Sequence, residues 1–80
     1  MIKLKDLLAL MSYAAVDFSE DAFIQIMDDE YGSHYRLVDG KLKVGGDFLP
    51  GRETDPDKLM EHQVTAIEVN HLNQIEIYVK

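Results

Sequence analysis

VTAIEV at residues 64–69 and QIEIYV at residues 74–79 are the two runs that decide the fold of this chain. In the second run the apolar residues Ile75, Ile77 and Val79 alternate with more polar residues. An alternation of period two is typical of a strand with one buried face and one face in water. Because only a short turn separates the two runs, we predict that they form a β-hairpin.

A second hairpin is predicted upstream, where the runs 35–38 and 41–44 flank the dipeptide Asp39-Gly40. Asp-Gly supplies the positive φ angles that a two-residue type I′ turn needs at both central positions. Lys41 and Lys43 add charge to the second run, and such charge is typical of an edge strand that is protected against pairing with other chains.

Two helices are predicted outside the hairpins. The apolar residues near the N-terminus recur at the i, i+3, i+4, i+7 spacing of a helix; they are Leu4, Leu7, Leu8 and Met11. This stripe predicts a helix over about residues 3–15. Further on, Asp55 and Pro56 are typical of the cap and first position of a helix, which predicts a second, short helix over about 56–62.

Residues 22–28 are compatible with a strand or with a helix. Ile24 and Ile26 are β-branched and alternate with other side chains, which favours a strand. The alternative is a helix that begins with Ser19 as its cap and acidic residues in its first turn. We predict the strand. The choice sets the distance between the acids that flank this segment, which is about 20 Å along a strand and about 12 Å along a helix.

These elements together predict one α+β domain over residues 1–80. We expect an antiparallel sheet of four or five strands, with the N-terminal helix packed on one face and a second short helix. The chain has no Cys, so no disulfide stabilises the domain, and this composition fits a reducing cytoplasm. No apolar run approaches the roughly 20 residues of a membrane span, so we expect a cytoplasmic protein.

The charge of the chain is distributed unevenly. The net charge is −7, and residues 17–30 hold six carboxylates with no Lys or Arg. Such a field disfavours direct binding of nucleic acid and favours a protein partner with a basic surface, such as a channel that holds DNA. The candidate partner-binding residues are the acids of this segment and the neighbouring aromatic residue, namely Asp17, Glu20, Asp21, Asp28, Asp29, Glu30 and Tyr31.

No motif for catalysis, metal binding or nucleotide binding stands out. His34, His62 and His71 are far apart in the sequence, and the glycines do not form a phosphate-binding loop. Glu68 and Glu76 could face each other across the C-terminal hairpin, as the paired carboxylates of hydrolases do. Their place on the polar face of a half-buried hairpin explains them without catalysis. We therefore predict a protein that is not an enzyme and that uses no cofactor or metal.

The two ends of the chain, residues 2–8, 64–69 and 74–80, resemble a loose group of short proteins encoded by phages and prophages of Gram-positive bacteria. The resemblance covers about 20 of the 80 positions. It implies a small accessory protein in the host cell. Some phage proteins of this size and acidity block host defences, notably CRISPR effectors, by stoichiometric binding. The expected function is therefore that of an acidic, DNA-mimic-like inhibitor of a host defence nuclease.

A small self-associating structural module is the alternative. The chain has more aromatic and Met side chains than one small core must hide, and an exposed subset would form a binding patch or a homodimer interface. These side chains are Phe23, Met27, Tyr31, Tyr35, Phe48 and Tyr78.

Overall fold

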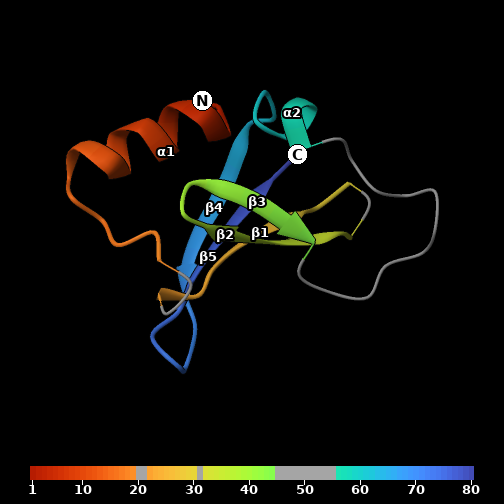
Figure 1. Cartoon of the computed structure of the whole chain (residues 1–80). Helices are drawn as coiled ribbons and strands as arrows, with labels where there is room; N and C mark the ends of the chain where they lie inside the picture. The colour runs from red at the N-terminus through yellow and green to blue at the C-terminus, as the bar shows by residue number, and fades with distance from the viewer. Residues whose placement is uncertain (20–21, 31, 45–55) are drawn as a thin grey trace.

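The computed structural model describes residues 1–19, 22–30, 32–44 and 56–80. The chain begins with a helix, continues with three strands and a second helix, and ends with two strands (Figure 1). In chain order the elements are α1 (Leu4–Tyr13), β1 (Ile24–Asp28), β2 (His34–Val38), β3 (Lys41–Val44), α2 (Pro56–Leu59), β4 (Val64–Val69) and β5 (Ile75–Val79).

The five strands of the described part of the chain form one sheet in the order β3-β2-β1-β5-β4. The last strand of the sequence, β5, therefore lies inside the sheet. It runs parallel to β1, where Ile26 pairs with Ile77, and antiparallel to β4, where Ile67 pairs with Ile77. The β1–β2 and β2–β3 pairs are antiparallel. This order leaves β3 and β4 as the two edges.

The segment 22–28 contains the predicted strand, β1. Ile24 and Ile26 are buried, whereas Gln25 and Met27 are partly exposed. Alternating burial of this kind is the period of a strand with one face in the core. The described acids on the two sides of this segment, Asp17 and Asp29, therefore lie at opposite ends of an extended segment, as the strand alternative requires.

One apolar core lies between the two helices and one face of the sheet (Figure 1). Both helices contribute to it, so both pack on the same face. The opposite face, which we call the open face, carries no helix from the residues that the structure describes. The buried core residues are Leu4, Leu7, Leu8, Ile24, Ile26, Tyr35, Leu37, Leu59, Ile77 and Val79.

Backbone hydrogen bonds attach the start of α1 to the start of β4. The Leu4 N–H donates to the His62 carbonyl at 2.9 Å, and the Val64 N–H donates to the Ile2 carbonyl at 2.8 Å. These bonds satisfy one of the N–H groups that the first turn of a helix leaves without an intrahelical partner. They also fix where α1 crosses the sheet, so that its apolar stripe meets the core.

The turn between β2 and β3 has the conformation that Asp39 and Gly40 predict. Their φ angles are 51° and 78°, both positive, as a type I′ turn requires. A residue other than Gly, Asn or Asp tolerates such angles poorly because its Cβ meets the neighbouring backbone. This turn sets the register in which β2 pairs with β3.

The α+β class, the helix on one face of the sheet and the short second helix are confirmed. Two details differ from the prediction. The sheet is mixed, because the β1–β5 pair is parallel. The second helix ends at Leu59 rather than at residue 62, and turns follow it. Asp55, the predicted cap of this helix, lies outside the described residues.

Ile77 and Ile67 face each other across the β4–β5 pair, yet their exposed fractions are 0% and 53%. The substitution Ile77→Ala should lower the free energy of unfolding by about 2–5 kcal/mol because it leaves a cavity in the core. Ile67→Ala should lower it by about 1 kcal/mol or less, since half of this side chain already lies in water. Urea denaturation measures both values. Equal losses would contradict the position of β4 at an uncovered edge.

Candidate functional site

The open face carries a row of polar and charged residues that crosses all five strands. In register across the sheet are Lys43 on β3, Arg36 on β2, Gln25 on β1, Glu76 on β5 and Glu68 on β4. Neighbouring strands are about 4.8 Å apart, so the two ends of the row are about 19 Å apart. The bases lie on one side of the face and the acids on the other, which gives the face opposite charges at its two edges.

Hydrogen bonds hold Glu76 on the acidic side of the open face. Asn70 Nδ2 donates to Glu76 Oε2 at 3.0 Å, and the Tyr78 hydroxyl donates to Glu76 Oε1 at 2.9 Å. The bond from Asn70 and then the bond from Tyr78 lower the pKa of Glu76 below its ordinary value, because both favour the ionised carboxylate. These bonds keep Glu76 ionised, so it carries its negative charge on the open face.

Asn70 is itself fixed by the turn that joins β4 to β5. Its Oδ1 accepts the Leu72 N–H at 2.9 Å and the Gln74 N–H at 3.0 Å, and its Nδ2 also donates to Gln74 Oε1 at 3.0 Å. A side chain that bonds backbone groups two residues on is the usual device of an Asx turn. The turn therefore orders the amide that holds Glu76.

Asp29, directly after β1, lies near Tyr78 on the side of β5 that faces β1. The Thr65 hydroxyl lies 3.2 Å from Asp29 Oδ2 and 3.3 Å from the Tyr78 carbonyl oxygen, which ties Asp29 to the β4–β5 pair. The hydrogen bond to Glu76, then burial, then the charges of Glu76, Glu68 and Asp29 raise the pKa of Tyr78 to about 12. The three carboxylates thus lie close enough to Tyr78 to raise its pKa. We call Asp29, Glu68, Glu76 and Tyr78 the acidic corner.

Those predicted site residues that the structure describes do not form one surface. Asp17 follows α1 and lies near the β2–β3 turn, since the carbonyl of the next residue, Phe18, accepts the Asp39 N–H at 2.9 Å. Asp29 and Glu30 are exposed at the other end of β1. Of the predicted residues that the structure describes, Asp29 alone belongs to the acidic corner. Glu20, Asp21 and Tyr31 lie outside the described residues.

Asp28 has a structural role instead of a place on the surface, because only 1% of it is exposed. Its Oδ1 accepts the Glu30 N–H at 3.0 Å. Its N–H donates to the Ser33 carbonyl at 2.8 Å, and its carbonyl accepts the Gly32 N–H at 2.7 Å. These bonds join the residues on either side of the β1–β2 turn. A carboxylate buried in this way is not accessible to a partner protein.

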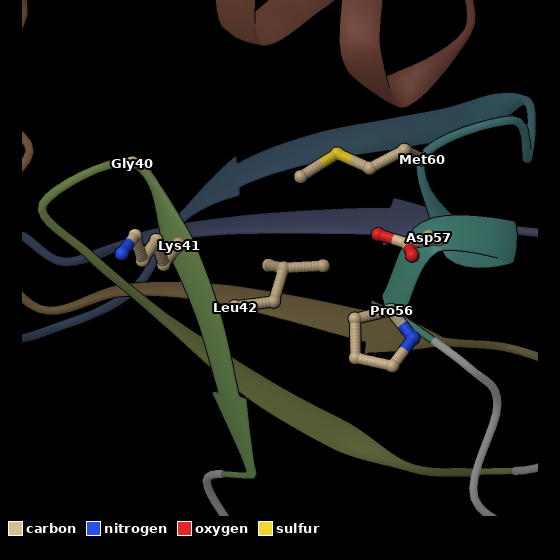
Figure 2. A pocket seen from close by; sticks show the side chains of 6 residues that line it. All are labelled: Gly40, Lys41, Leu42, Pro56, Asp57 and Met60. Atoms are coloured by element: carbon tan, nitrogen blue, oxygen red, sulfur yellow. The ribbon is translucent and has the colours of Figure 1, made fainter.

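A pocket of about 260 Å³ lies on the core side of the sheet, away from the acidic corner. Figure 2 shows the side chains of Leu42 and Met60 between β3 and α2, with Asp57 beside them. In the part of the chain that the structure describes, the lining combines apolar side chains with one acid and one base, and it holds no cluster of ligating groups. The lining residues are Gly40, Lys41, Leu42, Pro56, Asp57 and Met60.

Among the residues that the structure describes, no group of three or more His, Asp or Glu side chains is placed to hold a metal ion. No helix within the same residues is long and apolar enough to cross a membrane. No protein-family model matches the chain, and no curated protein or solved structure is significantly similar to it. The acidic corner is therefore the candidate site on the strength of its own geometry.

Sequence reasoning missed Asn70 and Thr65, which position the acids. Asn70 gave a usable signal, because an Asn at the end of a strand favours an Asx turn. No local feature of the sequence indicates that Asp29 lies near Tyr78. It depends on the pairing of β1 with β5, whose residues are about 50 positions apart in the sequence.

Adjacent acids provide a test of the structural role of Asp28. The substitution Asp28→Ala should lower the free energy of unfolding by about 1–3 kcal/mol, because the Glu30 N–H loses its charged acceptor. Asp29→Ala should change it by only about 0.5 kcal/mol, as is usual on a surface. Thermal and urea unfolding of both variants measure these values. A neutral Asp28→Ala substitution would show that the β1–β2 turn forms without this carboxylate.

The Tyr78–Glu76 bond predicts two effects of pH. The pKa of Tyr78 is raised, so the stability from this bond is complete below pH 10 and is lost as the pH rises to about 12. The pKa of Glu76 is lowered, so its contribution is present above the ordinary pKa of a Glu and is lost as the pH falls through its folded-state value. Titration followed by NMR should show that Glu76→Gln returns the pKa of Tyr78 toward 10. An unchanged pKa of Tyr78 in that variant would contradict the bond.

Proposed function

We propose that this protein acts without catalysis, by binding a basic surface of another protein through the acidic corner. The observation that carries the proposal is the convergence of three carboxylates, Asp29, Glu68 and Glu76, around Tyr78 on the open face. Asp29 directly follows β1, Glu76 lies on β5 and Glu68 lies on β4, and β5 pairs with both of the other strands. A prearranged field of one sign favours association with a surface of the opposite sign and excludes surfaces of like sign.

The remaining charges of the chain also favour a partner protein with a basic surface. The net charge of −7 attracts a basic protein from a distance, within the limit that salt sets. Lys43 and Arg36 lie at the other side of the open face and repel the same partner. A basic partner is thus directed toward β4 and β5 and away from β3.

The class of partner follows from where strong basic surfaces occur. Proteins that hold nucleic acid have channels lined with Lys and Arg, which neutralise phosphates. An acidic protein that occupies such a channel excludes the nucleic acid. With the resemblance of the chain ends to phage accessory proteins, this leads us to propose an inhibitor of a host defence nuclease, such as a CRISPR effector, that acts in the host cytoplasm.

Inhibition of DNA cleavage by a guide-loaded CRISPR nuclease tests the proposal. The protein should inhibit cleavage in proportion to its concentration, and the inhibition should weaken between 50 and 200 mM salt because ions screen the charges. Glu68→Lys should raise the inhibitory concentration about tenfold, which corresponds to about 1.4 kcal/mol.

The matched control is Asp6→Lys, which changes the charge by the same amount on α1, the helix on the core side of the sheet. This variant should inhibit as the wild type does. Inhibition that ignores salt, or that falls equally in both variants, would contradict binding through the acidic corner. A protein that inhibits no nuclease of this class would contradict the proposed target.

A further inference from the structure

The two edges of the sheet are protected to different degrees. The edge strand β3 presents the exposed residues Lys41 and Lys43, whereas β4 contains no Lys, Arg or Pro. Instead Ile67 and Val69 on β4 are 53% and 64% exposed, and Leu72 in the following turn is 63% exposed. Lys and Pro in particular keep edge strands from pairing with other chains. An edge that lacks them and exposes apolar side chains is a template for a further strand, and Glu68 is the one charged residue of β4.

The hydrogen-bond pattern of the hairpin directs the backbone groups of Ile67 and Val69 outward. Residues of an antiparallel strand alternate between bonding to one neighbour and facing the other side. The Asn70 N–H donates to the Gln74 carbonyl at 3.0 Å, so Asn70 bonds toward β5, and Glu68 does the same by alternation. The outward edge is occupied at its beginning, where the Val64 N–H donates to the Ile2 carbonyl. Within the described residues, no other strand covers it.

A strand added beside β4 would meet different chemistry on its two faces. On the core face Ile67 and Val69 continue the layer formed by Ile77 and Ile75. On the open face Glu68 stands beside Glu76. Side chains of opposite charge on neighbouring strands stabilise the pair, and so do neighbouring apolar side chains. The complementary strand therefore alternates apolar residues with Lys or Arg.

We infer that the outer edge of β4 binds an extended segment of the partner protein in which apolar residues alternate with Lys or Arg. Main-chain hydrogen bonds to Ile67 and Val69 hold the segment by strand addition, and Glu68 selects its basic side chains. The inference rests on the proposed function and specifies which part of the partner is bound. Lys41 and Lys43 repel the same segment from the β3 edge. A second copy of this chain fits less well, since it brings its own net charge of −7 and its own acidic corner.

A fluorescein-labelled octapeptide of alternating valine and lysine is the probe. The wild-type protein should bind it, and the amide resonances of Ile67 and Val69 should shift on binding while those of β3 do not. A peptide of the same composition with its valines and lysines in two blocks carries the same charge but cannot match both faces. The alternating peptide with N-methylated backbone amides retains the side chains but cannot complete the hydrogen bonds. The block peptide should bind up to about fivefold more weakly, the effect expected from the loss of a cross-strand pair. The N-methylated peptide should bind at least about fivefold more weakly, because it loses several main-chain hydrogen bonds.

Substitutions with matched controls test the core face and the open face of β4 separately. Ile67→Ser and Glu68→Gln should each weaken binding of the alternating peptide about fivefold. The controls are Leu10→Ser, at an exposed apolar residue of α1, and Asp6→Asn, and both should bind as the wild type does.

Three results overturn the edge inference. The first is equal affinity for the alternating, block and N-methylated peptides, which would indicate attraction by charge alone and leave the proposed function standing. The second is sedimentation of the protein as a dimer at micromolar concentration with Ile67 in the interface, which would assign the edge to a second copy. The third is no binding of any peptide at 50 mM salt, in which case the nuclease assay still decides the proposed function by itself.

Discussion

The parallel pairing of β1 with β5 is the interaction on which the rest of the structure depends. It joins two parts that are distant in sequence, the β1-β2-β3 meander and the β4–β5 hairpin. Ile26 and Ile77 meet there, and both are completely buried beneath the helices. A two-stranded hairpin alone is marginally stable in water. The pairing joins the three-stranded meander and the two-stranded hairpin into a five-stranded sheet with one core.

The same pairing also creates the candidate site. It brings Asp29, directly after β1, close to Tyr78 on β5, which also carries Glu76, and Glu68 lies on the neighbouring strand β4. It places the lysines of β3 at one edge and leaves β4 at the other. Charge separation across the open face and an apolar outer edge thus have one structural origin. Hydrogen bonds from neighbouring side chains position the carboxylates of Asp29 and Glu76.

Most of the local structure could be predicted from the sequence, since it is encoded by neighbouring residues. The alternation in residues 74–79, the Asp39-Gly40 turn and the apolar stripe of α1 each specify their own element. The order of strands is encoded differently. Nothing within residues 22–28 indicates that this strand lies beside β5 and runs parallel to it, because that pairing reflects burial of Ile26 and Ile77 in a common core. The predicted strand already separates the acids of residues 17–30 into two groups, but no neighbouring residue indicates that Asp28 is buried or that Asp29 lies beside β5.

Hydrogen exchange of the chain alone tests most directly whether the outer edge of β4 is open. The amide of Ile77, inside the sheet, should exchange only when the whole domain unfolds, as core amides do. The amides of Ile67 and Val69 should exchange orders of magnitude faster than that of Glu68 between them, since they face outward and Glu68 bonds toward β5. Such alternating protection along β4 is the result that an open edge predicts. Protection of Ile67 and Val69 equal to that of Ile77 would contradict it, because the edge would then already be covered.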